Sequence, residues 1–179
     1  MEKARKKLEY FWMYYKWHVI LPAAFLMIAA GIIYSFLGEE EMLLNVYLIN
    51  TGTRLGAAEE IAADFKKESH IGDGKVLLDA TLSIDTQDFN ENAYTGSLEK
   101  ITTEVFAHDL DVIIAPMDVV VYYGERGAVD EAAARSLAGS RWEEAFGMEE
   151  PLYICILNNS GRKEMAEEFV SYMLQSRKP

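Results

Sequence analysis

The segment Met42-Leu-Leu-Asn-Val-Tyr-Leu-Ile-Asn50 decides the fold of this chain. It is almost continuously apolar and contains several residue types that favour β-strands. A strand that faces water on one side alternates polar and apolar residues, whereas a continuous apolar run is typical of a strand covered on both faces. The segment therefore predicts a central strand of an α/β domain, in which helices cover both faces of a sheet.

The residues after this strand alternate between helix and strand patterns. Thr51-Gly52 indicates a turn, and Thr53 is expected to cap a helix over residues 54–68, where apolar residues recur at helical spacing. We predict further strands at 75–80, 110–115 and 152–157, and further helices at 97–107, 117–123, 131–137 and 162–175. Strands that alternate with helices predict a mostly parallel sheet.

A second apolar run, residues 18–37, precedes the domain and carries no charge after His18. Roughly 20 apolar residues at about 1.5 Å each span the ~30 Å hydrocarbon core of a bilayer. We therefore predict one N-terminal transmembrane helix at 18–38. A cleaved signal peptide is the alternative, but its apolar region would be only about 7–15 residues long, and Ala29-Ala30-Gly31, which could mimic a cleavage site, lies inside the run.

The charges on either side of the run predict its direction. Basic residues precede it, and Glu39-Glu40-Glu41 follows it. Because basic residues stay on the cytoplasmic side, we expect a single-pass protein of the cell membrane with its N-terminus inside. The chain then divides into a basic and aromatic cytoplasmic tail (1–17), the transmembrane helix (18–38) and an extracytoplasmic α/β domain (39–179).

The composition narrows the possible partners. Residues 39–179 contain 12 basic and 27 acidic side chains, which gives them a net charge of −15. This charge argues against nucleic acid and would suit a cationic ligand or partner. The single cysteine, Cys155, allows no internal disulfide, which fits the envelope of Gram-positive bacteria. The expected partners are the lipid bilayer and an envelope protein.

Two segments carry a resemblance to a known family. The first is Leu110-Asp-Val-Ile-Ile-Ala115, with Pro116, a short helix and Gly127-Ala-Val129 after it. The second is Leu152-Tyr-Ile-Cys-Ile-Leu157, with Asn158-Asn-Ser160 and a closing helix that contains Ala166, Phe169 and Leu174.

This order of elements resembles the extracellular solute-binding proteins of bacteria, which have the type II periplasmic-binding fold. The N-terminal anchor and the length are also similar to those of small single-span membrane proteins of Firmicutes. The resemblance implies a reduced, periplasmic-binding-protein-like domain, because such proteins usually have two lobes and more residues. No ligand-binding residue is carried over, because the matching segments are packing motifs.

The turn after the first predicted strand is one candidate ligand site. Thr51, Gly52, Thr53 and Arg54 follow that strand directly, and ligands of open α/β sheets bind at the carboxyl ends of strands. Free N–H groups of the helix, together with Arg54, could hold an anion or a carboxylate. The turn has neither phosphate-binding fingerprint, so an ordinary capped turn is the alternative.

The polar loop at residues 85–96 is the other candidate. Asp85 and Asp88 offer oxygen ligands of the kind that hard cations prefer, but the loop lacks the glycine and the spacing of an EF-hand. A solvated loop is therefore the favoured interpretation. Phe89 and Tyr94 could instead line a pocket or contact a partner, and Asp85, Asp88 and Tyr94 complete the predicted ligand-binding set.

No combination of residues in the sequence predicts catalysis. The three histidines lie far apart, and none has a second ligand at metal-binding spacing. Cys155 lies in the middle of a predicted strand, where a buried structural thiol is expected. We therefore expect no enzyme activity, no catalytic residues, no metal site and no cofactor.

The sequence leads to one main hypothesis and two alternatives. The main hypothesis is a membrane-anchored, non-catalytic extracytoplasmic domain that binds another protein as an accessory subunit of an envelope complex. The first alternative is a receptor of the solute-binding type for a small solute or a peptide, which a deep, enclosed pocket at residues 51–55 and 85–94 would favour. The second alternative, an envelope enzyme, has no support in the sequence.

Overall fold

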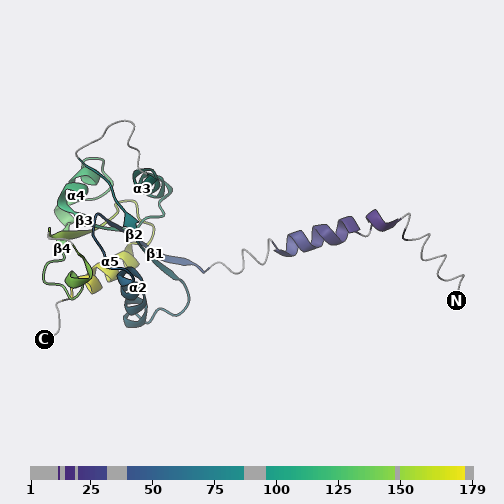
Figure 1. Cartoon of the computed structure of the whole chain (residues 1–179), viewed down its shortest axis with the longest axis horizontal. Helices are drawn as coiled ribbons and strands as arrows, with labels where there is room; N and C mark the ends of the chain where they lie inside the picture. Colours follow the sequence, from purple (N-terminus) through teal and green to yellow (C-terminus); the bar gives the residue numbers. More distant parts are fainter. Residues whose placement is uncertain are drawn as a thin grey trace, which may run out of the picture. The chain divides into compact units, whose positions relative to one another are not determined.

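The computed structural model describes residues 12, 15–18, 20–31, 40–86, 96–147 and 150–175. The chain divides into two compact units, Met1–Glu40 and Glu41–Pro179. The described part of the first unit is helical, and the second unit is an α/β domain (Figure 1).

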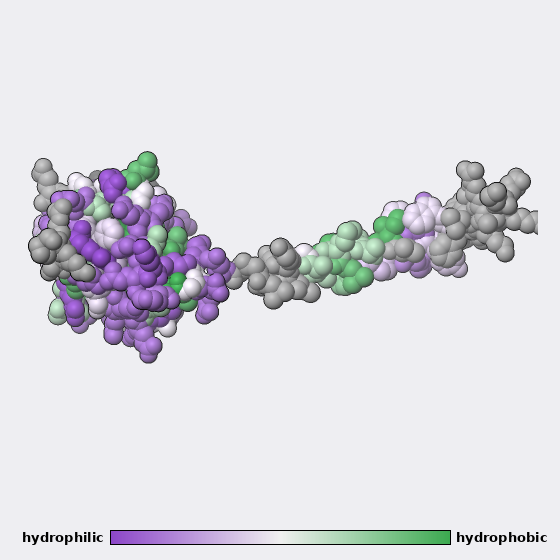
Figure 2. Space-filling view, turned by 90° about the horizontal axis from the view of Figure 1, so that it is seen from below, coloured by the Kyte–Doolittle hydropathy of each residue, from purple (hydrophilic) through white to green (hydrophobic). Residues whose placement is uncertain are grey.

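The predicted transmembrane helix is overturned. Among the described residues, none of the helices combines the length and the apolar character that crossing a membrane requires. The longest described helical stretch of the first unit, residues 20–31, has an apolar surface (Figure 2). At 1.5 Å per residue these described residues account for about 18 Å of helix, less than the ~30 Å hydrocarbon core. Positions 19 and 32–38 of the prediction lie outside the described residues.

The domain is built on a sheet of five strands in the order β2-β1-β3-β5-β4. The central strand β1 runs parallel to both β2 and β3, whereas β5 runs antiparallel to both β3 and β4. The bounds are Met42–Ile49 for β1, Lys75–Leu82 for β2, Val112–Pro116 for β3, Arg135–Ser136 for β4 and Leu152–Ile156 for β5.

The prediction of a mostly parallel sheet is therefore wrong, and the sheet is mixed. A parallel connection needs a crossover, usually a helix, that returns the chain to the starting end of the sheet. Among the described residues between β4 and β5, the only regular element is the short 3₁₀ helix η2 (Glu143–Ala145), and β5 runs opposite to β4. The helix predicted at 131–137 is instead the 3₁₀ helix η1 (Glu131–Ala133) followed by β4.

Four helices cover the two faces of the sheet. Figure 1 shows α2 (Ala57–Glu68) and α5 (Lys163–Met173) on one side and α3 (Gly96–Ala107) and α4 (Met117–Gly124) on the other. The side chains of β1 alternate between the two resulting cores: Leu44, Val46 and Leu48 pack in one, and Tyr47 and Ile49 in the other. This burial on both faces explains the continuous apolar run and confirms the predicted central strand.

The helix after β1 begins later than predicted. It starts at Ala57 rather than at Arg54, because Gly56 has a φ of 80° and cannot continue a right-handed helix. Thr53 does not cap this helix, because it pairs with Phe146 in an isolated β-bridge. The turn between β1 and α2 is therefore longer and more exposed than the sequence indicates.

A buried carboxylate fixes the amino-terminal end of the sheet. Asp111 is fully buried just before β3, and its Oδ2 accepts hydrogen bonds from the backbone N–H of Asn45 (2.9 Å) and from Nε of Arg162 (2.8 Å). Its Oδ1 accepts a hydrogen bond from Ser160 Oγ at 2.7 Å. Nη2 of Arg162 also donates to the carbonyl of Asp109 at 2.7 Å. The network joins β1, the start of β3 and the turn before α5.

We predict that Asp111→Ala lowers the free energy of unfolding by about 3–5 kcal/mol, because it leaves buried donors and the Arg162 guanidinium without their acceptor. The matched control is Asp109→Ala, whose exposed side chain should contribute less than about 0.5 kcal/mol. Urea denaturation followed by circular dichroism measures both. A loss as small as that of the control would show that the network does not hold the sheet.

Candidate functional site

The predicted ligand-binding turn borders an open cavity at the carboxyl ends of β1 and β2. We call this cavity, of about 850 Å³, the strand-end depression. It opens between the turn after β1, the end of β2 and the first turn of α4. The lining residues are Asn50, Thr51, Gly52, Thr53, Ala80, Thr81, Leu82, Ser83, Ile84, Asp85, Thr86 and Asp118.

Asn50 holds the two strand ends together beneath the depression. Its backbone has a φ of 52°, a conformation that asparagine tolerates better than most residues. Its side-chain Nδ2 donates to the carbonyl of Ile84 at 2.7 Å, and its Oδ1 accepts from the N–H of Ile84 and from Ser83 Oγ, both at 2.9 Å. The segment after β2 is thereby tied to the end of β1.

Asp79 supports the wall of the depression that β2 forms. Its Oδ1 accepts hydrogen bonds from the backbone N–H (2.9 Å) and the hydroxyl (2.6 Å) of Thr81, which lines the cavity. Lys100 of α3 donates to Oδ2 at 2.6 Å. Burial by itself would raise the pKa of Asp79, but the hydrogen bonds from Lys100 and Thr81 outweigh it and lower the pKa below its ordinary value of 3.8.

The lining of the depression is hydroxylic and acidic. The hydroxyls of Thr51 and Thr53 share a hydrogen bond, and that of Thr86 donates to Oδ2 of Asp118 at 2.5 Å. Asp85 adds a second carboxylate, and none of the described lining residues is Lys, Arg or His. This chemistry suits a positively charged or hydroxyl-rich ligand rather than an anion.

The structure brings together part of the predicted ligand-binding set. Thr51, Gly52, Thr53 and Asp85 all line the depression, whereas Asp88 and Tyr94 lie outside the described residues. Arg54 does not line it, because its guanidinium pairs with Glu60 at 2.9 Å. Since α2 also starts three residues after Arg54, the arrangement does not favour the anion site that the sequence predicts.

Sequence reasoning missed Asp118, the second carboxylate of the depression. It lies 33 positions after Asp85 in the chain, and only the fold brings the two segments to one cavity. One signal could have found it: Asp118 follows a predicted buried strand almost directly, at the carboxyl end where parallel strands place their ligand-binding residues.

Two apolar side chains in the segments next to the depression are exposed. Leu55, two residues after Thr53, has 97% of its surface exposed, and Met117, directly before Asp118, has 39% exposed. A single exposed apolar residue needs no explanation. The visible face of the domain is mostly hydrophilic (Figure 2). Leu55 and Met117 do not line the depression themselves, but they lie within two residues of Thr53 and Asp118, which do, and exposed apolar residues next to polar ones are typical of a binding surface.

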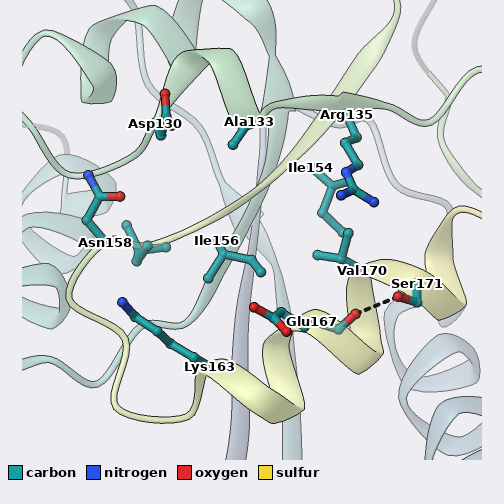
Figure 3. Close-up of a pocket in the computed structure, with 11 residues that line it drawn as sticks. Asp130, Ala133, Arg135, Ile154, Ile156, Asn158, Lys163, Glu167, Val170 and Ser171 are labelled. Atoms are coloured by element: carbon teal, nitrogen blue, oxygen red, sulfur yellow. Dashed lines mark hydrogen bonds between the residues drawn. The ribbon is translucent and has the colours of Figure 1, made fainter.

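A second cavity, of about 560 Å³, lies between β4, β5 and α5, and we call it the edge groove. Figure 3 shows Lys163 and Glu167 of α5 on one side of this groove, with Asp130 and Arg135 on the other. Its apolar floor is formed by Ile154, Ile156 and Val170. Ile154 is only 1% and Val170 only 7% exposed, so a ligand here would gain little apolar contact. The strand-end depression is therefore the better candidate site.

Comparisons of the chain with protein-family models, with curated proteins and with solved structures gave no match. The resemblance to solute-binding proteins of Firmicutes therefore stays a prediction, as does the placement outside the cytoplasm. Among the described residues, no group of three or more His, Cys, Asp or Glu side chains could hold a metal ion. The expected absence of enzyme activity is likewise a prediction that no finding tests.

We predict that the contribution of the Asp79–Lys100 pair to stability is lost in acid. Because folding lowers the pKa of Asp79, its contribution is fully present above the ordinary value of 3.8 and is lost as the pH falls through the lowered pKa. Asp79→Asn should cost about 0.5–1 kcal/mol at neutral pH, since Lys100 is 45% exposed, and progressively less in acid.

Urea denaturation of both proteins between neutral pH and pH ~2.5 measures this difference. Asp73→Asn, on an exposed turn before β2, is the matched control and should change stability by less than about 0.5 kcal/mol throughout. A difference between wild type and Asp79→Asn that stays constant or grows in acid would contradict the prediction.

Proposed function

We propose that residues 41–179 form a non-catalytic binding domain, an accessory subunit of an envelope complex, and that a partner protein binds at the strand-end depression. The observation that carries this proposal is the exposure of Leu55, 97% of whose surface is open to solvent in the turn that lines the cavity. Burying a leucine side chain contributes about 1.5–3 kcal/mol, so Leu55 can serve as an apolar anchor for a partner.

The shape of the depression favours a protein over a small molecule. Pockets for small ligands bury most of the ligand surface and are lined mainly by apolar groups. The strand-end depression is wide and open, and seven of its twelve lining residues carry a hydroxyl or a carboxylate group. A protein interface combines an apolar contact with a polar, hydrated surround, and Leu55 and Met117 beside this polar cavity provide both.

The charge of the domain indicates what the partner carries. Asp85 and Asp118 line the depression, and residues 39–179 have a net charge of −15. Complementary charge speeds association and excludes partners of like charge. The proposed partner segment therefore carries Lys or Arg next to an apolar residue, and its binding weakens with rising salt because exposed charges are screened.

We predict that a photo-crosslinking amino acid at position 55 captures one defined partner in cells. The matched control is position 106, because Phe106 is also exposed (80%) but lies near the end of α3, close to the start of β3 rather than to the carboxyl ends of the strands. The readout is the set of covalent adducts resolved by mass, with Asp118→Lys expected to reduce the adduct from position 55. Equal adduct patterns from both positions, or none from position 55, would contradict the proposal.

A small-ligand receptor is the second candidate function, and the hydrogen-bonding side chains around the depression are the observation in its favour. Thr53, Thr81, Ser83 and Thr86 add hydroxyl groups to the two carboxylates of the lining, and such groups can hydrogen-bond a small polar molecule. Amines, hydroxyl-rich sugars and short basic peptides fit this lining.

We predict for this candidate that one of these compounds raises the melting temperature of the full chain as its concentration increases, because a ligand that binds only the folded state stabilises it. Asp118→Asn should reduce the shift, whereas Asp73→Asn, which is exposed and precedes the start of β2, at the opposite end of that strand from the cavity, should leave it unchanged. The absence of any concentration-dependent shift across the panel would remove this candidate.

A further inference from the structure

The strand β2 forms an open edge of the sheet. Among the described residues no strand pairs with its outer side, because the strand order begins with β2. Its eight residues contrast with the two of β4 at the opposite edge. A long edge strand offers a row of backbone donors and acceptors to another strand, and proteins normally block such an edge with short strands, charges or covering segments.

Alternate residues of β2 direct both their backbone N–H and their C=O group away from β1. The N–H of Lys75 donates to the carbonyl of Glu41 at 2.8 Å, so the hydrogen-bonding groups of Lys75 point toward β1. Because these groups alternate along a strand, those of Val76 and Leu78 point away from β1. In an antiparallel pairing centred on Leu77, the outward N–H and C=O groups of Val76 and of Leu78 would each exchange hydrogen bonds with one residue of the partner strand.

The side chain of Leu77 lies at the middle of this edge. Val76 and Leu78 pack against the core under α2, but Leu77 belongs to neither core cluster and is partly exposed. An apolar residue at the centre of an open edge strand gains contact when a second strand covers it. The edge therefore offers an apolar side chain as well as outward-pointing backbone N–H and C=O groups.

We propose that β2 pairs antiparallel with β2 of a second copy of this chain, about a two-fold axis at Leu77. In that register Leu77 opposes Leu77 of the second copy, Val76 opposes Leu78, and Lys75 opposes Asp79. Charges on an edge strand normally prevent pairing with another strand. Here the two charges have opposite signs and lie the same distance from Leu77, so a two-fold axis turns them into two complementary pairs.

The neighbouring interactions are compatible with this register. Asp79 already accepts a hydrogen bond from Lys100 at 2.6 Å, and its two oxygens leave room for Lys75 of the second copy to join the same cluster. Lys75 is exposed and its side chain lies on the same face of the strand as those of Leu77 and Asp79. The pairing would join the two sheets into one continuous sheet of ten strands.

A disulfide experiment tests the register directly. In a non-hydrogen-bonded antiparallel pair the two Cα atoms are about 4.5 Å apart, within the range that a disulfide bridges. Leu77→Cys should therefore form a covalent dimer of the full chain under mild oxidation. The native Cys155 can stay, because it is only 2% exposed and burial, with a smaller effect of Asp130, raises its pKa to about 11.

The matched control is Lys75→Cys on the same face of the same strand. In the proposed register its two copies lie about 13 Å apart along the strands, too far for a disulfide. Leu77→Cys should crosslink roughly tenfold faster than Lys75→Cys, because pairing makes the reaction effectively intramolecular. Any association through residues 1–40 contributes equally to both variants, and circular dichroism confirms that both are folded.

A charge change supplies an independent readout in the Leu77→Cys protein. Lys75→Glu places like charges opposite each other and should lower the rate of covalent dimer formation about two- to fivefold. Lys67→Glu, an equal change of charge on the exposed side of α2, should leave the rate unchanged. The proposal is overturned if Leu77→Cys and Lys75→Cys crosslink at equal rates, if Lys75→Cys crosslinks faster, or if no crosslinking is detected. It is also overturned if Lys75→Glu and Lys67→Glu change the rate equally.

Discussion

The domain depends on satisfying one charge that has no access to water. Removing a carboxylate such as that of Asp111 from water costs several kcal/mol unless donors replace the lost hydration. Here three donors do so, and they come from β1, from the turn before α5 and from Arg162 at the start of that helix. Because the donors belong to β1 and to the turn before α5, and Asp111 itself directly precedes β3, the carboxylate is satisfied only when β1, β3 and the start of α5 hold their native positions. One interaction thereby specifies how three separate parts of the chain meet.

The hydrogen-bond network around Asp111 lies at one end of the sheet, and the strand-end depression lies at the other. At the Asp111 end the carboxylate is buried and accepts three hydrogen bonds, which contributes to stability. At the carboxyl ends of β1 and β2, Asn50 supplies neutral hydrogen bonds, and seven of the residues that line the depression carry a hydroxyl or a carboxylate group. The turn containing Leu55 is held by its backbone, through the bridge between Thr53 and Phe146 and the hydrogen bond from the N–H of Arg54 to the carbonyl of Ala145. The side chain of Leu55 therefore takes no part in the core and stays exposed.

Sequence patterns predicted the elements that are buried on both faces and failed where long-range pairing decides the outcome. The apolar runs of β1 and β3 can be read locally, because burial on both faces leaves a continuous apolar segment. The orientation of β5 depends on how the chain between β4 and β5 packs, and the Ala-rich segment at 131–137 looks helical only until its packing is known. Local patterns predict elements, but not their order or direction in a sheet.

The candidate site shows the same division. Thr51, Gly52, Thr53 and Asp85 could be predicted because they follow strands directly, and such positions gather at one edge of a sheet. The role of Arg54 in an anion site stays a prediction that the structure does not favour, because the guanidinium pairs with Glu60 in the first turn of α2, a contact that depends on where α2 begins. Because Arg54 pairs with Glu60, the acidic side chains of the domain determine which partners it attracts. A basic partner is attracted over the whole surface. A second copy, whose residues 39–179 also carry a net charge of −15, is repelled except where Lys75 faces Asp79. Added salt screens both effects, so it weakens contact with a basic partner and eases contact between copies, which gives the two proposed surfaces opposite responses to ionic strength.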